Sequence, residues 1–217
     1  RSDVTLVFDK GSASMLNSLE LTDAGIGWVA AVPWNQVPEE VRNMPLDGFH
    51  SCGHELPGVR WAERNGLVQG QTRRCILMHS STFEAEQLHS LMGNIAKACD
   101  KLRALARDLT KSRQNPRKEE AIRARISDIL AGQWLKTVIN VALTKSESDS
   151  HSLQFGIDNE ALSNLIAFRL GRTVLTTTRS EWDPDAVISA YHGQESVERS
   201  SRSLKEGAGA TWGPAYH

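Results

Sequence analysis

The stretch that decides the fold lies near the end of the chain and reads Tyr191-His-Gly-Gln194-Glu-Ser-Val-Glu198-Arg-Ser-Ser-Arg202-Ser-Leu-Lys205. In a helix, residues three, four and seven positions apart stack along one side. That spacing connects Tyr191, Gln194, Glu198 and Lys205. A carboxylate between a phenol and an ammonium suits phosphate handling, because the acid can hold a metal ion while its neighbours bind ester oxygens. The alternative is a solvated amphipathic helix whose polar spacing has no function.

A second acid follows the first strand expected in the chain. Val4-Thr-Leu-Val-Phe8 is a short β-branched and aromatic run, and Asp9-Lys10-Gly11 reads as the turn after it. Open α/β sheets hold their active sites at the carboxyl edge, where this aspartate would lie. The alternative role for Asp9 is an Asx turn or a helix cap. We expect a helix from about Ser14 to Asp23 and a second buried strand at 26–32.

Both acids resemble those of one protein family. Tyr191, Glu198 and Lys205 match the Tyr-x2-Arg-x3-Glu-x6-Lys signature of bacterial insertion-sequence transposases of the DDE class. Residues 6–12 are similar to the family's strand that carries its second catalytic aspartate. The match is incomplete, because Gln194 stands where the signature has arginine.

The resemblance implies an α/β fold with a partial ribonuclease H-like core, interrupted by an α+β insertion that contains a long helical hairpin. Residues 1–48 would form the first part of the core, and residues 173–217 would return to it with the catalytic helix. Residues 49–172 would form the insertion, with a β-hairpin, a helical hairpin at 83–131 and further strands. The implied activity is cut-and-paste phosphoryl transfer by a two-metal mechanism that uses Mg²⁺ or Mn²⁺.

The resemblance assigns catalysis and metal binding to Asp9 and Glu198. Contacts with DNA or phosphate are expected from Tyr191, Gln194, Arg202, Lys205, Lys10 and Trp182. Trp182 has a structural alternative, because Asp183 can cap a helix that starts at Pro184 and the indole can then pack on Val187. The family also needs an earlier strand-ending aspartate, which these residues lack. We therefore expect a fragment that does not cleave DNA by itself.

The amino-acid composition limits which binding partners and which cellular compartment are expected. The net charge of −1 argues against a nucleic-acid partner, although metal-binding acids can offset a local basic patch. No apolar run approaches the roughly 20 residues that cross a bilayer. Three well-separated cysteines suit a reducing compartment. We expect a cytoplasmic, nucleoid-associated bacterial protein with no membrane partner, which binds transposon ends and target DNA as a homodimer.

One loop carries residue types that suit zinc. His50-Ser-Cys52-Gly-His54 lacks a second pair at metal spacing, which favours a polar loop. After this loop, strands are expected at 59–63 and 72–79, joined by a hairpin turn at Asn65-Gly66. Further strands are predicted at 137–143, 152–157 and 173–177, and Asp158 is predicted to cap a helix that ends near Phe168.

The middle of the chain has the clearest helical periodicity. Apolar residues recur there in steps of three and four, at Leu88, Leu91, Ile95, Ala98, Leu102, Leu105 and Leu109. The pattern predicts one helix over about 83–110 with a seam for a partner helix. A returning helix around 122–130 would complete an antiparallel hairpin, whose basic tip is either solvated or in contact with DNA or a second protomer. The competing function is a non-catalytic regulatory or interaction fragment that dimerises through this seam.

Overall fold

The computed structural model describes residues 4–8, 20–53, 56–111, 118–146 and 150–193. The chain divides into two compact units. Unit 1 comprises residues 1–80 and 172–217, and unit 2 comprises residues 81–171. Each unit combines helices with mostly antiparallel strands, which confirms the mixed α/β composition. No described helix is both long enough and apolar enough to cross a bilayer.

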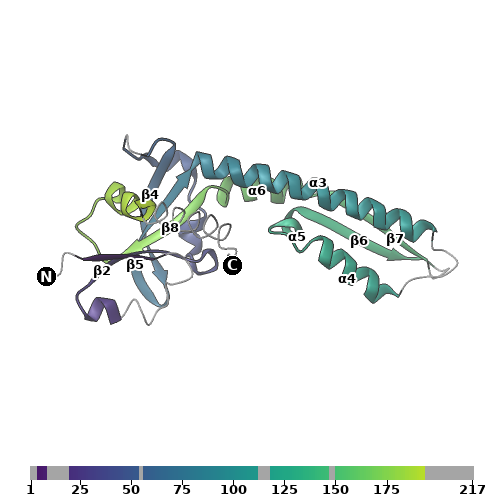
Figure 1. Cartoon of the computed structure of the whole chain (residues 1–217), viewed down its shortest axis with the longest axis horizontal. Coiled ribbons are helices and arrows are strands. Elements are labelled where there is room, and N and C mark those ends of the chain that lie inside the picture. Colours follow the sequence, from purple (N-terminus) through teal and green to yellow (C-terminus); the bar gives the residue numbers. More distant parts are fainter. Residues whose placement is uncertain (1–3, 9–19, 54–55, 112–117, 147–149, 194–217) are drawn as a thin grey trace, which may run out of the picture. The chain divides into compact units, whose positions relative to one another are not determined.

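Unit 1 is built on a six-stranded sheet with the strand order β1-β2-β8-β5-β4-β3 (Figure 1). The strands are β1 Thr5–Phe8, β2 Gly27–Ala31, β3 His50–Ser51, β4 Val59–Val68, β5 Gln71–Ser80 and β8 Arg172–Thr177. The pair β1 and β2 is parallel, and the other neighbours in this sheet are antiparallel. These bounds confirm the strands predicted at 4–8, 26–32 and 173–177.

One face of this sheet is covered by three short helical segments, η1 Trp34–Gln36, α2 Glu39–Arg42 and η2 Leu46–Gly48. Val37 and Val41 pack there with the strand residues Val68, Cys75, Leu77 and Val174. The guanidinium of Arg172 is buried, and its Nη1 donates to the carbonyl oxygens of Arg42 and Met44 at 3.2 and 2.7 Å. This segment, residues 34–48, therefore belongs to the core of unit 1.

The opposite face is covered by a final helix, residues 184–193. Val187, Ile188 and Tyr191 of this helix form a hydrophobic cluster with the sheet residues that point to the same side, and we call it the helix-side cluster. Its sheet members are Val29, Ala31, Val59, Ile76, Met78 and Leu175, with Val7, Cys52, Leu56, Trp61 and Trp182 packed at the rim.

The β4–β5 hairpin corrects one prediction. Asn65 and Gly66 lie inside β4, paired with Arg74 and Arg73, and the turn falls at Gln69-Gly70, where both φ angles are positive at 51° and 77°. A pair of central residues with positive φ is the signature of a type I′ hairpin turn. Gly66 is needed for packing, because a Cβ there would lie 2.8 Å from the Pro38 side chain.

The unit boundary also differs from the predicted insertion of 49–172. Strands β3, β4 and β5 all belong to the sheet of unit 1. Unit 2 begins at Ser81, directly after β5, and ends at Gly171, directly before β8.

Unit 2 contains the long helix α3 Ser81–Lys111, which confirms the helix predicted at 83–110. Its other elements are α4 Glu119–Ile129, α5 Leu135–Val138, β6 Ile139–Lys145, β7 His151–Ile157 and α6 Asn159–Phe168. Strands β6 and β7 form a two-stranded antiparallel ribbon. The Asp158 carboxylate caps α6 by accepting from the Ala161 N–H at 2.9 Å, as predicted.

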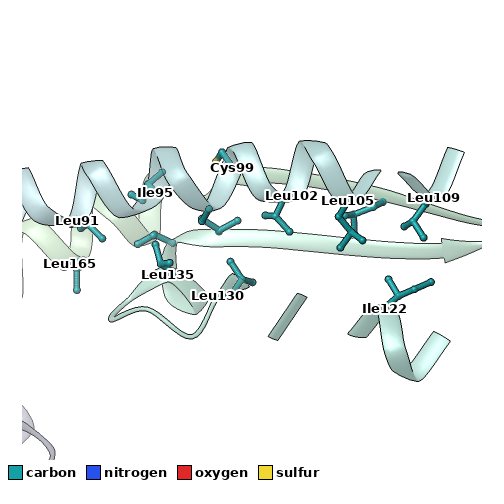
Figure 2. Close-up of a cluster of buried hydrophobic side chains, with 14 of the residues drawn as sticks. Leu91, Ile95, Cys99, Leu102, Leu105, Leu109, Ile122, Leu130, Leu135 and Leu165 are labelled. Atoms are coloured by element: carbon teal, nitrogen blue, oxygen red, sulfur yellow. The ribbon is translucent and has the colours of Figure 1, made fainter. Parts of the chain in front are cut away.

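The apolar seam of α3 is buried as predicted, but its main partner is different. Leu102, Leu105 and Leu109 are 0 to 5% exposed and point toward the ribbon in Figure 2. The most extensive neighbour of α3 is β7, with smaller contributions from α4 and α5. The helical hairpin is therefore part of a mixed layer of helices and strands. Among the described residues the seam is covered by elements of its own chain, and dimerisation through it stays a prediction.

Candidate functional site

The carboxyl edge of the parallel pair is the place where the sequence predicts the first acid. Phe8, the last residue of β1, pairs with Ala30 of β2, and both strands run in the same direction. Asp9 follows Phe8 in the sequence, but Asp9 and Lys10 lie outside the described residues. Their predicted roles in metal and phosphate binding therefore stay predictions.

The final helix starts where the sequence predicts. Asp183 accepts from the Ala186 N–H at 2.7 Å, and the helix begins at Pro184. This is the expected N-cap arrangement, with proline at the first helical position. The predicted site residues that come later in this stretch lie outside the described part of the chain: Gln194, Glu198, Arg202 and Lys205.

Tyr191 is the predicted phosphate ligand whose surroundings are visible. It is 9% exposed and belongs to the helix-side cluster together with Ile188. Val7 of β1 packs against the same cluster. The tyrosine ring thus has a structural role. The Val7 side chain, two residues before Asp9, lies on the sheet face that the final helix covers.

Trp182 is half-buried at the rim of the helix-side cluster. Its indole packs beside the cluster that contains Val187, as the predicted hydrophobic staple requires. The guanidinium carbon of Arg179 lies 5.7 Å from the indole centroid, which is within the range of a cation–π contact. These contacts favour the structural role of Trp182, and its use as a stacking platform for a base stays a prediction.

Two arginines that the sequence analysis does not single out fix the connection between β8 and the final helix. Arg179 donates from Nε to the Thr5 hydroxyl and from Nη2 to the Val4 carbonyl, each at 3.0 Å. Arg74 donates from Nη1 to the carbonyl oxygens of Arg179 and Trp182 at 3.1 and 2.6 Å. Such partners are far apart in sequence, so no local pattern reveals them.

Arg74 is itself held by an acid. It makes a two-pronged ion pair with Glu63 on the neighbouring strand, with both N–O distances at 2.9 Å. The Glu63 hydrogen bond raises the pKa of Arg74 above its ordinary value. Arg74 therefore stays charged at every physiological pH, and it can hold the two backbone carbonyls as a fixed cation.

The loop that contains His50 and Cys52 is tied to the final helix by hydrogen bonds. The Asp185 carboxylate accepts from the Trp61 indole N–H at 2.7 Å, from the Gly53 N–H at 3.0 Å and from the Cys52 thiol at 3.2 Å. The His50 ring packs on Trp61 with centroids 4.8 Å apart. Across the described residues, no three acidic, histidine or cysteine side chains are grouped as metal ligands, and His54 lies outside them.

Burial and the adjacent Asp185 raise the pKa of the Cys52 thiol to about 11. A thiol with that pKa is almost fully protonated at neutral pH, so it is a poor nucleophile and a poor metal ligand. The hydrogen bond between Cys52 and Asp185 thus ties the loop at residues 50–53 to the start of the final helix, and we call this contact the clamp. The raised pKa of Cys52 thus accords with a structural role for the thiol at this position.

Comparisons with protein-family models, curated proteins and solved structures found no match to this chain.

Proposed function

We propose that this chain carries two of the acids of a DDE-class DNA transposase, Asp9 and Glu198. The resemblance of residues 6–12 and 191–205 to that class motivates the proposal. The finer proposal for the fold is a partial ribonuclease H-like core in unit 1, with unit 2 as its insertion. In agreement with this, unit 2 interrupts the sheet of unit 1 between the neighbouring strands β5 and β8.

One observation supports the proposal best. Val7 of β1 and Tyr191 of the final helix pack in the same cluster on the same face of the sheet. Asp9 is two residues beyond Val7, and strand alternation repeats every two residues. Glu198 is seven residues beyond Tyr191, or about 10 Å along a continuing helix. The strand before Asp9 and the helix before Glu198 therefore both contribute side chains to one hydrophobic cluster.

The donor set suits the proposed chemistry. Carboxylate oxygens are the ligands that Mg²⁺ and Mn²⁺ take, and the bound cations would stabilise charge on the attacking and leaving oxygens of a phosphodiester. Lys205 and Arg202 would hold phosphates as cations, and Gln194 would donate an uncharged and weaker hydrogen bond. Lys10 would act next to Asp9. The intact transposase would work as a homodimer on transposon ends and target DNA.

Metal binding by the chain is the first test. We expect isothermal titration calorimetry with Mn²⁺ to show binding that Asp9→Asn and Glu198→Gln each weaken by at least about tenfold, since each removes a charged ligand. Asp47→Asn is the matched control, because Asp47 is an exposed acid of unit 1 outside both motifs. Binding that is equal in all four proteins would refute the proposed site.

Cleavage is the second test. Two of the three acids of the class are present, so we expect no nicking of DNA by this chain alone. A version extended by the upstream coding sequence is expected to nick DNA only with Mg²⁺ or Mn²⁺, and to lose this activity with Asp9→Asn or Glu198→Gln. An extended protein with bound metal and no nicking would leave a binding function as the better account.

A further inference from the structure

Strand β1 is weakly held by the sheet itself. It has four residues, lies at the end of the strand order and, among the described strands, pairs with β2 alone. A parallel pair of this length has few hydrogen bonds, and a slip of one residue turns each side chain to the opposite face. Such a slip would turn the Val7 side chain away from the helix-side cluster. It would also reverse which residues of β1 face the cluster.

Arg179 holds this strand from outside the ladder. Its Nε and Nη2 donate to the Thr5 hydroxyl and the Val4 carbonyl, each at 3.0 Å, and its side chain is only 20% exposed. A one-residue slip would replace the Thr5 hydroxyl by the side chain of Val4 or Leu6, neither of which can accept a hydrogen bond. The two hydrogen bonds of the Arg179 guanidinium can therefore both form in only one register of β1.

Gly27 makes room for this contact. It is the register partner of Thr5, and a Cβ at this position would overlap the Arg179 guanidinium. The backbone of Arg179 is fixed in turn, because its N–H donates to the Thr177 hydroxyl at 3.0 Å and its carbonyl accepts from Arg74. These contacts fix the Arg179 backbone at the end of β8, and from there its guanidinium binds β1.

We infer that Arg179 is a positioning residue that fixes the register of β1 against the sheet and the final helix. The effect of Arg179 on metal binding rests on the proposed function, because Arg179 would act through Asp9. The register itself can be tested without that function.

The register test uses hydrogen exchange of the whole chain. In Arg179→Ala we expect the amides of β1 to exchange at least about tenfold faster, because two hydrogen bonds from a charged group are lost, while β4 and β5 are unchanged. Arg179→Lys should restore only part of the protection, because lysine lacks the fork geometry. Arg64→Ala is the matched control, since Arg64 bonds to the Glu40 carbonyl in the same unit. Unchanged exchange of β1 in Arg179→Ala would overturn the inference.

The positioning test measures Mn²⁺ affinity in the same proteins. We expect Arg179→Ala to weaken the binding that depends on Asp9 by about tenfold. Val41→Ala, which empties part of the buried core on the other sheet face, should leave it unchanged. If Arg179→Ala does not fold, Thr5→Val removes the acceptor alone and takes its place. Faster exchange of β1 with unchanged Mn²⁺ affinity would overturn the positioning role, whereas wild-type binding that does not need Asp9 would refute the proposed function and leave the register test valid.

Discussion

Substitution of Leu102 by alanine tests whether the apolar seam of α3 is a core or a dimer surface. Leu102 is 0% exposed and lies in the hydrophobic core of unit 2. The substitution removes three buried carbons, about 2.4 kcal/mol of transfer free energy at ~0.8 kcal/mol each. A cavity adds to this cost, so we expect a loss of about 3 to 4 kcal/mol in the free energy of unfolding of unit 2.

Two buried thiols allow the two units to be followed separately. Cys99 is part of the core of unit 2, and Cys75 lies in the core of unit 1. Alkylation of each cysteine in increasing urea, read by mass spectrometry, gives a midpoint for each unit. With an m value of about 1.5 to 2 kcal/mol per M, Leu102→Ala should lower the Cys99 midpoint by about 2 M and leave the Cys75 midpoint in place.

The control is Met92→Ala on the same helix. Met92 is 46% exposed, so its loss should change stability by no more than ~0.5 kcal/mol. The reasoning would be refuted if Leu102→Ala behaved like Met92→Ala. A Cys99 midpoint that falls on tenfold dilution of the wild-type protein would instead show that the seam is shared between two chains, as the non-catalytic dimer requires.

Three further perturbations test local features of the structure. Gln69→Asn should make unit 1 more stable in thermal unfolding than Gln36→Ala by about 0.5 to 1 kcal/mol, because both changes remove the Gln69–Gln36 hydrogen bond but asparagine tolerates positive φ better than glutamine; equal stability of the two variants would contradict the type I′ turn. Asp185→Asn removes a negative charge beside Cys52, so the thiol pKa should fall below about 11 and alkylation at a fixed pH should accelerate; an unchanged pH–rate profile would contradict the clamp. The hydrogen bond from the Ala161 N–H lowers the pKa of Asp158 in the folded protein. The ionised carboxylate therefore stabilises unit 2 at pH values above the ordinary aspartate pKa of ~3.9, and this stabilisation is lost as the pH falls through the lower pKa of the folded state. In acid titrations followed by circular dichroism, the stability advantage of wild type over Asp158→Ala should shrink below about pH 4.

Local features of the fold follow from the sequence where a nearby residue determines them. The caps by Asp158 and Asp183 depend on backbone groups three residues away, and both are as predicted. The seam of α3 is also predicted, because helical periodicity determines which residues are buried together. The same periodicity carries no information about the partner, so a two-stranded ribbon occupies the place expected for a second helix.

The displaced hairpin turn shows the opposite case. Asn-Gly has a strong local preference for a two-residue turn, yet β4 continues through Asn65 and Gly66. Gly66 lies against Pro38 and Val41, so its missing Cβ serves the packing of α2. A turn at Asn65-Gly66 would give up that contact and most of the ladder with β5. Tertiary packing therefore overrides the local preference, and the less favoured Gln69 takes the positive φ.

Sequence motifs nominate the acids of the candidate site, whose roles stay predictions, but they do not nominate the residues that support the neighbouring strand and helix. Asp9 and Glu198 are marked by motifs, whereas Arg179 and Thr5 are far apart in the chain and follow no motif. Long-range contacts of this kind also explain how unit 2 can interrupt the sheet. Ser80 and Arg172 end and begin the antiparallel pair β5 and β8, whose register is fixed by pairs such as Leu77 with Val174. Because the ladder and the arginine contacts lie within unit 1, and unit 2 has its own core, changes in the size or sequence of unit 2 should leave the register of β1 unaltered.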